Sequence, residues 1–452
     1  MDRITQQVAL GTANAGGDKY WFSQIGGTQG DYAEKARVDS QGNVITVGWW
    51  EVSGRGYEAG VTKHDSDGNL LWQKLISSQT NSWYHDTFRD VAIDSSDNIY
   101  CVGRVNYTSK AFIVKFNSSG VEQWQREYRS TTGDAAFSRV QLDSSENLIV
   151  VGGSSFTGGN DAVIVKYNSS GTLQWQRQQH KTSGYLSFQD LAIDSNDNIF
   201  VTGTGYTNSS NYWCCLVKYD SSGSEQWQKY LYDSSQTNAL NAGRGIGLDS
   251  SGNIYIGGWI NLTNVGACSY VIKLNSSGTI QWDKYVQQGS HGGGEEAIDI
   301  AVTPSGDCYL VGFGNAIKNG RTEGVLYKFN SSGTLQYMRR FGQKNYSSNN
   351  MWQFRSVAVD DADENLYISG AGVEGGQGDY DWLIFKVPTD GSMTGDYMNN
   401  NVTYEAITGR STSARNFSTT TGSMTPQSPS HTSHTSTWYS SNSSFTDSLT
   451  NL

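Results

Sequence analysis

One short pattern returns six times along this chain of 452 residues, at nearly even intervals. Each copy is a turn that begins with Asn or Asp and ends with Gly, followed four residues later by an aromatic residue, as in NSSGVEQW at 117–124. With an earlier tryptophan, the marker aromatics are Trp21, Trp72, Trp124, Trp175, Trp227, Trp282 and Tyr337. Their spacing of 51 to 55 residues is typical of β-propeller blades.

Each unit divides into four short strands and two tight turns. In the second unit the predicted strands are 88–94, 98–104, 110–116 and 121–128, and the turns are DSSDN and NSSG. Asn or Asp at the start of a turn bonds to its own backbone, and Gly at the end adopts positive φ, as hairpin connections require. Only 4 prolines and an aromatic content of 12% also favour strands. The sequence therefore predicts an all-β fold, a seven-bladed β-propeller of four-stranded blades.

The repeated tryptophan is interpreted as structural, because a large flat side chain at one place in each blade packs against the next blade. The last unit lacks it and has Gly395 four residues after its turn glycine. The stretch KYWFSQIGG around Trp21, in turn, has no preceding strands of its own. We therefore expect the N-terminal strand to complete blade seven and close the ring.

The repeat resembles the β-propeller family often called SBBP repeats over residues 19–397. The shared features are the D-x-x-[GDEN]-N-[IVL] turn, the VG at the end of the second strand, and the K-[YF]-[ND]-x-x-G-x-x-x-W hairpin. This resemblance implies the propeller fold and no particular activity. In overall style, with its short N-terminus and Gly/Ser/Asn-rich β structure, the chain is also similar to virion proteins of tailed phages of marine bacteria. Residues 1–18 then form an N-terminal arm, and 398–452 a polar C-terminal extension.

Composition excludes several classes of partner. The formal net charge of −11 argues against a nucleic-acid-binding surface. The N-terminus has no apolar run typical of a signal peptide, and no 18-residue apolar stretch predicts membrane insertion. We therefore expect synthesis in a host cytoplasm and, from the phage resemblance, localisation in the virion.

Two enzyme classes were weighed as alternatives. The aromatic follows its glycine by four residues, not by the three of a sialidase Asp-box. The four-residue interval is similar to the tryptophan-docking repeats of quinoproteins, which implies a quinone cofactor near adjacent cysteines such as Cys214 and Cys215. Neighbouring side chains of a strand point to opposite faces, however, so these two are interpreted as buried strand residues. Neither the 6 histidines nor the 5 cysteines form a catalytic or metal-binding set. We expect no catalytic residues, no cofactor and no metal, although Asp65, Asp67 and Asn69 leave a calcium loop open.

Charged residues recur at the innermost strand of successive blades. The residues at one equivalent position, called here the axial ring, are Lys35, Asp90, Arg139, Asp190, Gly245, Asp299 and Ser356. Their signs alternate over the first four blades, which predicts blade-to-blade pairing near the axis. The alternative is a polar channel mouth that binds a small ligand. The acidic pair Glu295 and Glu296 is interpreted as a solvated loop.

The two faces of the disc differ in sequence. Both tight turns of every blade lie on one face, whereas the connections on the other face are long and all different. Loops on a rigid scaffold carry binding groups, and these are rich in Trp, Tyr, Asn and Ser. The candidate ligand-binding residues are Trp49, Trp50, Trp83, Tyr84, Tyr206, Trp259 and Trp352. We expect about half of these aromatics to be buried in blade packing instead.

After residue 397 the chain is dominated by Ser, Thr and Asn, so this extension cannot bury enough apolar surface to fold alone. The candidate partner-docking residues are Tyr404, Phe417, Trp438, Tyr439 and Phe445. The sequence hypothesis is a non-enzymatic virion protein, a tail-fibre or particle-surface component. It would be mounted on other virion proteins by its terminal segments and would present a propeller to a host glycan or protein. The alternatives are a carbohydrate-binding adhesin head and, third, a propeller enzyme.

Overall fold

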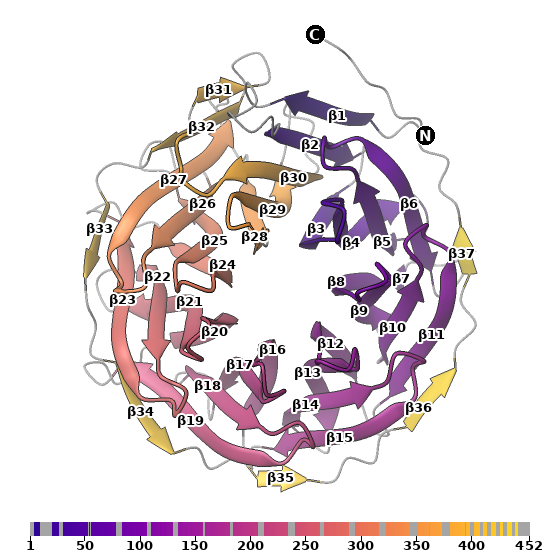
Figure 1. The fold of residues 1–452 in the computed structure, drawn as a ribbon, viewed down its shortest axis with the longest axis vertical. Coiled ribbons are helices and arrows are strands. Elements are labelled where there is room, and N and C mark those ends of the chain that lie inside the picture. The colour runs from indigo at the N-terminus through magenta and orange to yellow at the C-terminus, as the bar shows by residue number, and fades with distance from the viewer. Residues whose placement is uncertain are drawn as a thin grey trace.

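A computed structural model describes residues 4–441 except for these gaps: 10–19, 27–29, 53, 55, 78–83, 106–109, 130–133, 157–158, 181–183, 207–211, 234–239, 263–265, 289–293, 316–321, 344–350, 361, 373–379, 394, 398–401, 407–409, 414–416, 422–424, 428–431 and 436–438. Seven antiparallel blades stand in a ring around a central axis (Figure 1). The predicted seven-bladed propeller of four-stranded blades is confirmed.

In each blade the strands run outward from the axis in sequence order. Blade 1 contains β3 (Asp31–Val38), β4 (Val44–Val52), β5 (Gly56–His64) and β6 (Leu70–Ser77). Blade 2 contains β8 (Thr87–Ile93), β9 (Ile99–Val105), β10 (Lys110–Phe116) and β11 (Glu122–Arg129). Blade 3 contains β12 (Ala135–Leu142), β13 (Leu148–Phe156), β14 (Gly159–Tyr167) and β15 (Leu173–His180). Blade 4 contains β16 (Tyr185–Ile193), β17 (Ile199–Tyr206), β18 (Tyr212–Tyr219) and β19 (Glu225–Asp233).

The remaining blades repeat this plan, and the last one is completed by the N-terminus. Blade 5 contains β20 (Leu240–Leu248), β21 (Ile254–Leu262), β22 (Gly266–Leu274) and β23 (Ile280–Gln288). Blade 6 contains β24 (Glu295–Val302), β25 (Cys308–Asn315), β26 (Thr322–Phe329) and β27 (Leu335–Gln343). Blade 7 contains β28 (Trp352–Val359), β29 (Asn365–Gly372), β30 (Asp381–Pro388) and β2 (Trp21–Gly26).

The ring closes where β2 pairs with β30, in antiparallel register from Trp21↔Lys386 to Ile25↔Trp382. The expected closure by the N-terminal strand is therefore confirmed. A further strand, β1 (Ile4–Ala9), pairs with the outer side of β2. Part of the stretch expected to be a separate N-terminal arm is thus a fifth strand of blade 7.

The repeated aromatic residue docks on the outer turn of the next blade. Trp124 Nε1 donates a hydrogen bond to the carbonyl oxygen of Ser169 at 3.2 Å. Gly171, in the same turn, has φ +76°, and a Cβ there would lie 3.2 Å from the Trp124 ring. Equivalent hydrogen bonds to the next turn are made by Trp21, Trp72, Trp282 and Tyr337. The turn glycine thus supplies both positive φ and room for the tryptophan of the preceding blade.

The inner turns are fixed by their first residue, as predicted. Asp94 Oδ1 accepts hydrogen bonds from the amides of Ser96 and Asn98 at 3.0 and 2.8 Å. Asp65, which left a calcium loop open, has the same geometry in an outer turn, accepting from the amides of Asp67 and Asn69. These carboxylates are therefore accounted for by the turns themselves.

The apolar core lies between neighbouring blades. One cluster joins Val61 of blade 1 to Val91 and Val114 of blade 2, and similar clusters follow around the ring. Cys214 and Cys215 belong to two different clusters, on opposite faces of β18. Both thiols are buried and free, so the interpretation as strand residues holds.

The C-terminal extension runs around the outside of the ring (Figure 1). Its strands are β31 (Gly395–Tyr397), β32 (Val402–Ala406), β33 (Arg410–Ser413), β34 (Phe417–Thr421), β35 (Thr425–Gln427), β36 (Thr432–Thr435) and β37 (Tyr439–Ser441). From β32 to β37, each pairs antiparallel with the outermost strand of one blade, in descending order from blade 6 to blade 1. These segments are ordered by backbone pairing to their own propeller, a possibility that the polar composition did not reveal.

Candidate functional site

A β-bulge interrupts the innermost strand of every blade. In blade 2 the pairing with β9 jumps from Phe88 to Asp90, and the same jump occurs at the equivalent place in the other six blades. The skipped residues, called here the cavity ring, are Glu34, Arg89, Ser138, Gln189, Arg244, Ile298 and Arg355. A bulge turns a side chain out of the regular pleat and often does so next to a functional site.

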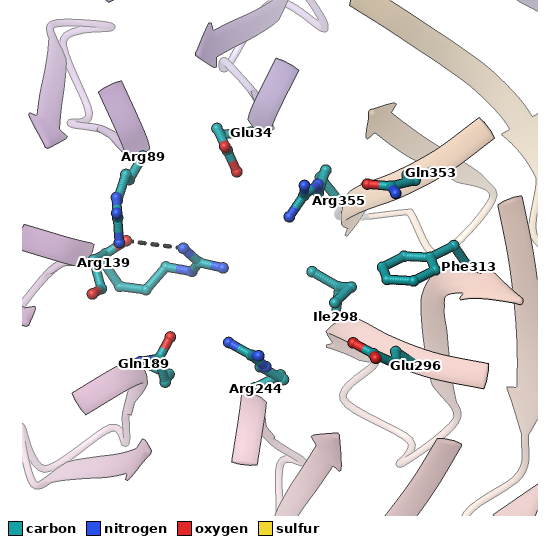
Figure 2. A pocket seen from close by; sticks show the side chains of 11 residues that line it. Glu34, Arg89, Arg139, Gln189, Arg244, Glu296, Ile298, Phe313, Gln353 and Arg355 are labelled. Carbon is teal, nitrogen blue, oxygen red and sulfur yellow. Dashed lines mark hydrogen bonds between the residues drawn. The ribbon is translucent and has the colours of Figure 1, made fainter. Parts of the chain in front are cut away.

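All seven cavity-ring residues line one cavity of about 330 Å³ on the axis. Arg139, Glu296, Phe313 and Gln353 complete its wall. Figure 2 shows the guanidinium groups of Arg89, Arg139, Arg244 and Arg355 converging on the same space. The cavity ring lies at or before the midpoint of each innermost strand, and Glu296 and Gln353 of the wall lie near the start of theirs, which the chain enters from a long connection. The cavity therefore lies toward the face of variable connections.

The axial ring, one residue further along each strand, is paired within the protein. Lys35 Nζ lies 2.6 Å from Asp299 Oδ2, and both side chains are almost fully buried. The same Asp299 oxygen accepts a hydrogen bond from the amide of Val357 in the next blade, at 2.9 Å. Asp90 and Asp190 accept equivalent bonds from the amides of the following blades, at 2.8 and 2.9 Å. The expected blade-to-blade pairing near the axis is present.

One axial-ring position is a glycine for steric reasons. A Cβ on Gly245 would lie 2.9 Å from the amide nitrogen of Ile300 in blade 6. Blades 5 and 6 thus approach too closely here for a side chain. This gap in the alternation of charge follows from packing and does not mark a ligand site.

Electrostatics differ between the axial carboxylates. Burial alone would raise the pKa of Asp299, but the Lys35 ammonium and the Arg139 guanidinium hold it below its ordinary value. For Asp190, burial outweighs the attraction of Lys35 and Arg139 and raises its pKa to about 6. Each of these two carboxylates belongs to the residue that directly follows a cavity-ring residue in the sequence. Their contacts are with other residues of the protein.

The cavity-ring arginines are much less engaged. Arg89 and Arg244 make no hydrogen bond or ion pair with any other described residue. The Nε atoms of the cavity-ring residues Arg244 and Arg355, and that of Arg139 in the axial ring, are buried without a hydrogen-bond partner in the described part of the chain. Burial lowers the pKa of both Arg89 and Arg244, because the cationic form loses hydration there. Donor groups are thus held, partly desolvated, around an open space.

A second cavity of about 230 Å³ adjoins the first and shares Arg89, Ser138 and Gln189 with it. It extends between blades 2, 3 and 4, past Arg104 and Tyr185. Tyr185 stacks on Tyr206, with ring centroids 5.1 Å apart and planes 7° apart. Tyr206, a candidate from the sequence, therefore belongs to an aromatic group at the border of this second cavity.

The prediction of ligand binding is wrong for two of the aromatic residues. Trp50 is fully buried and stacks on Trp382 of blade 7, with ring centroids 4.3 Å apart. Trp352 is also buried, in the core cluster between blades 6 and 7. Both belong to the packing share that was expected among these aromatics, because a large ring on an inner strand fills the space between blades.

The other candidates are not brought together into one site. Trp49 is half-buried, stacks on Tyr32 and makes a tilted ring contact with Tyr57. Arg355 of the cavity lies over the Tyr32 ring at 5.8 Å. Trp259 is half-buried on blade 5. Tyr84 lies in the short strand β7 (Tyr84–His85), which pairs with β5, and Trp83 lies outside the described residues. Their role in binding stays a prediction.

Three tail aromatics occupy backbone positions in the outer strands. Tyr404 pairs with Phe341, Phe417 with Asp233, and Tyr439 with Ser77. Trp438 and Phe445 lie outside the described residues. Docking of these five residues on a separate partner stays a prediction, but the paired segments already have partners within the chain.

Sequence reasoning missed the cavity ring. It identified the axial ring, one residue later in each strand, and interpreted Glu295 and Glu296 as a solvated loop. That interpretation is wrong, because both lie in β24, where Glu295 is buried and Glu296 lines the cavity. A signal was present, since Glu, Arg, Ser, Gln, Arg, Ile and Arg occupy one position of an otherwise regular repeat.

The described residues contain no metal-binding cluster and no membrane-spanning helix. None of them forms a group of three or more His, Cys, Asp or Glu side chains placed to hold a metal ion. Nor do they include a helix with the length and apolar character needed to cross a membrane.

Comparisons with known proteins support the fold. Residues 148–173, in blade 3, match a family model described as a β-propeller domain of unknown function, DUF5122. An uncharacterized WD repeat-containing protein of Acanthamoeba polyphaga mimivirus is 25% identical over 209 residues, which cover 40% of this chain and 13% of the viral protein. The chain thus spans a small part of that relative.

Among solved structures, the polysaccharide lyase Uly1 is similar with a TM-score of 0.50 and 9% identity, over 79% of this chain and 90% of the lyase. The periplasmic gluconolactonase PpgL of Pseudomonas aeruginosa is similar with a TM-score of 0.44 and 10% identity, over 84% of this chain and 99% of that protein. At such identities the likeness concerns the fold alone. The chain is a seven-bladed β-propeller, with a DUF5122-type repeat in its third blade.

Proposed function

We propose that this protein is a non-enzymatic binding protein that holds its ligand in the axial cavity, on the face of variable connections. The observation that carries this proposal is the ring of seven bulges, which directs one side chain from every blade into a single cavity. Those seven positions carry five residue types, while the turns on the opposite face are nearly uniform. Variation confined to one concave surface of a rigid scaffold is typical of a recognition site.

The residues that line the axial cavity also favour ligand binding over catalysis. Arginine, glutamine and serine donate hydrogen bonds at fixed positions, which suits recognition of a polar ligand. Glu34 and Glu296 are carboxylates of the wall, and burial raises the pKa of Glu296. An adhesin head, which binds carbohydrate, is compatible with this arrangement and is the alternative form of the same proposal.

The test is to fill the cavity. Gln189→Trp places a large ring at the cavity wall, and the matched control Gln123→Trp adds the same ring at an exposed rim position. A glycan array and a metabolite library, followed by thermal shift, should reveal a ligand for the wild type and the control but not for Gln189→Trp. Equal responses from both variants, or turnover of the ligand, would contradict the proposal.

We propose as a second role that the protein is a structural component of a virus particle, with the same face presented to a host surface. The likeness to a mimivirus protein favours this role, although it covers 40% of the chain. The terminal segments would provide attachment to other virion proteins, because β33, β36 and β37 are the last strands of their sheets and an outer strand edge accepts another strand. Mass spectrometry of purified particles should detect the chain in stoichiometric amounts, and its absence there would refute this role.

A further inference from the structure

We propose that the axial cavity binds a small polyanion, one that carries two or more carboxylate, sulfate or phosphate groups. This inference rests on the proposed function, since it assigns the chemistry of the ligand for the same cavity. It begins from the charges of the wall. Four arginines and two glutamates line it, and Arg139 is paired with Asp190. The other three arginines exceed the two glutamates by one positive charge, in a chain whose formal net charge is −11.

Most of the arginines of the wall are not paired with neighbouring residues. Arg139 is the most engaged, because its Nη1 donates to the Ser138 carbonyl oxygen at 2.9 Å and its Nε lies 3.7 Å from Asp190. Arg355 lies over the Tyr32 ring, which leaves the edge of its guanidinium free to donate. Arg89 and Arg244 have no hydrogen bond or ion pair among the described residues. Three guanidinium groups on blades 2, 5 and 7 are therefore available to a ligand.

The placement of these three groups selects the kind of anion. They come from separated blades and converge on a shared space (Figure 2), so one small oxyanion does not satisfy all of them. A planar guanidinium matches a carboxylate, sulfate or phosphate through two parallel hydrogen bonds, and such bonds are strong when partly desolvated. A ligand with several oxyanion groups neutralises the excess charge and fills the donors together.

The surroundings are consistent with an anion. The carboxylates of the axial ring are compensated, Asp299 by Lys35 and by the Val357 amide, so they do not present unpaired negative charge to the cavity. The adjoining cavity offers Arg104, whose buried Nε also lacks a hydrogen-bond partner within the described residues. An elongated polyanion can therefore extend from the axis toward the stacked Tyr185 and Tyr206.

Calorimetric titration of the full chain tests the proposal with three anionic probes: citrate, inorganic tripolyphosphate and a trisulfated disaccharide. The unsulfated disaccharide serves as the neutral probe. At least one anion should bind, and the strongest of the three identifies the oxyanion chemistry. Arg244→Gln and Arg355→Gln should each weaken that binding at least tenfold, since a charge-assisted hydrogen bond contributes that much. Arg355→Lys should recover only part of it, because lysine lacks the planar fork.

The control is Arg340→Gln, which removes the same charge from outer strand β27, where Arg340 pairs with Glu323. It should bind as the wild type does. Unchanged melting temperatures of the cavity variants exclude misfolding. If no anion binds, or if Arg340→Gln weakens binding as much as Arg244→Gln, the inference is overturned. Should a neutral or cationic compound bind and be lost in Gln189→Trp, the proposed binding function survives and only the anion assignment falls.

Discussion

The axis and the rim of this propeller are built from opposite kinds of repetition. At the rim, one interaction recurs: an aromatic side chain docks on the outer turn of the next blade, as Trp72, Trp124 and Trp282 all do. At the axis, equivalent positions carry different residues, and their contacts depend on which blades they join. The repeated residues hold neighbouring blades together in the same way around the ring. The residues that differ make contacts that are specific to particular blades.

The axis itself divides into two levels. The axial ring is bonded within the protein, although its Arg139 also lines the cavity, whereas the cavity ring, one residue earlier in each strand, faces the cavity. The β-bulge separates the two, because without it consecutive residues would simply alternate between the faces of the blade. Stability at the axis and binding at the axis are thus assigned to neighbouring residues, and mutations should separate them.

The largest effect is expected at the axial ring. Asp299→Ala leaves the buried Lys35 ammonium without its partner and removes the acceptor of the Val357 amide, so it should lower the free energy of unfolding by about 3 to 5 kcal/mol. Urea denaturation measures the change. The double variant Lys35→Met/Asp299→Leu should recover part of the loss, because no buried charge remains. A loss below about 1 kcal/mol, the range of an exposed ion pair, would contradict burial of this pair.

Rim tryptophans should give smaller and uniform losses. Trp72→Ala, Trp124→Ala and Trp282→Ala each remove a half-buried ring, and each should cost about 2 kcal/mol, below the range for fully buried aromatics. The same denaturation experiment compares them. Agreement among the three within about 0.5 kcal/mol supports equivalence of the rim contacts, and a spread as wide as that among axial variants would break the comparison.

The tail belongs to the rim, and its removal should change association more than folding. Truncation after residue 397 removes β32–β37 and opens the outer edges of six blades. The tail strands β32–β37 are three to five residues long and the blade strands that they cover are eight or nine, so truncation leaves longer open edges. Long open edges pair with other chains, so the truncated protein should fold but form concentration-dependent oligomers. Light scattering and circular dichroism measure the two properties. A truncated chain that stays monomeric at the highest concentration tested would show that the tail strands do not protect the blade edges against association.

A pH dependence is also expected at the axis, confined to a narrow pH window. Burial raises the pKa of Asp190 to about 6 in the folded protein, against 3.8 for an ordinary aspartate. The folded state thus holds this proton more tightly, and the resulting stability, complete below pH 3.8, is lost as pH rises through 6. Asp190→Asn should remove a slope of up to about 1.4 kcal/mol per pH unit in that window. Identical pH profiles of the variant and the wild type would refute the raised pKa.

Much of the fold could be predicted because its determinants are local. The turn at 117–120 fixes a hairpin through its own Asn and Gly, and a period of about 52 residues repeats that hairpin around the ring. Closure by the strand around Trp21 also follows from counting strands. The last unit lacks its outer strand, and the N-terminal strand has no other strands of its own unit. The turns and the repeat are set by short-range hydrogen bonding and by side-chain size, which are properties of the sequence itself.

The candidate site was only half predictable. The alternating charges of Lys35, Asp90 and Arg139 indicated pairing at the axis, but the bulge that brings Arg89, Arg244 and Arg355 into one cavity has no signal in a single strand. It appears only when the pairing register of two strands is known. For the same reason Trp50 and Trp352 could not be distinguished from exposed aromatics, because their burial depends on the neighbouring blade.

The sequence alone determined the number of blades and their turns, because both depend on contacts within about 50 residues. It also indicated the closure of the ring, because only one unit lacks its outer strand, although β2 and β30 come from opposite ends of the propeller. Tertiary structure alone decided which side chains meet across the axis, from blades as distant as Lys35 and Asp299, and where the polar tail lies. The tail segments carry few apolar side chains, which did not indicate a docking site on the propeller, and what orders them is the open backbone edge of each blade. Such an edge exists only after the ring has formed.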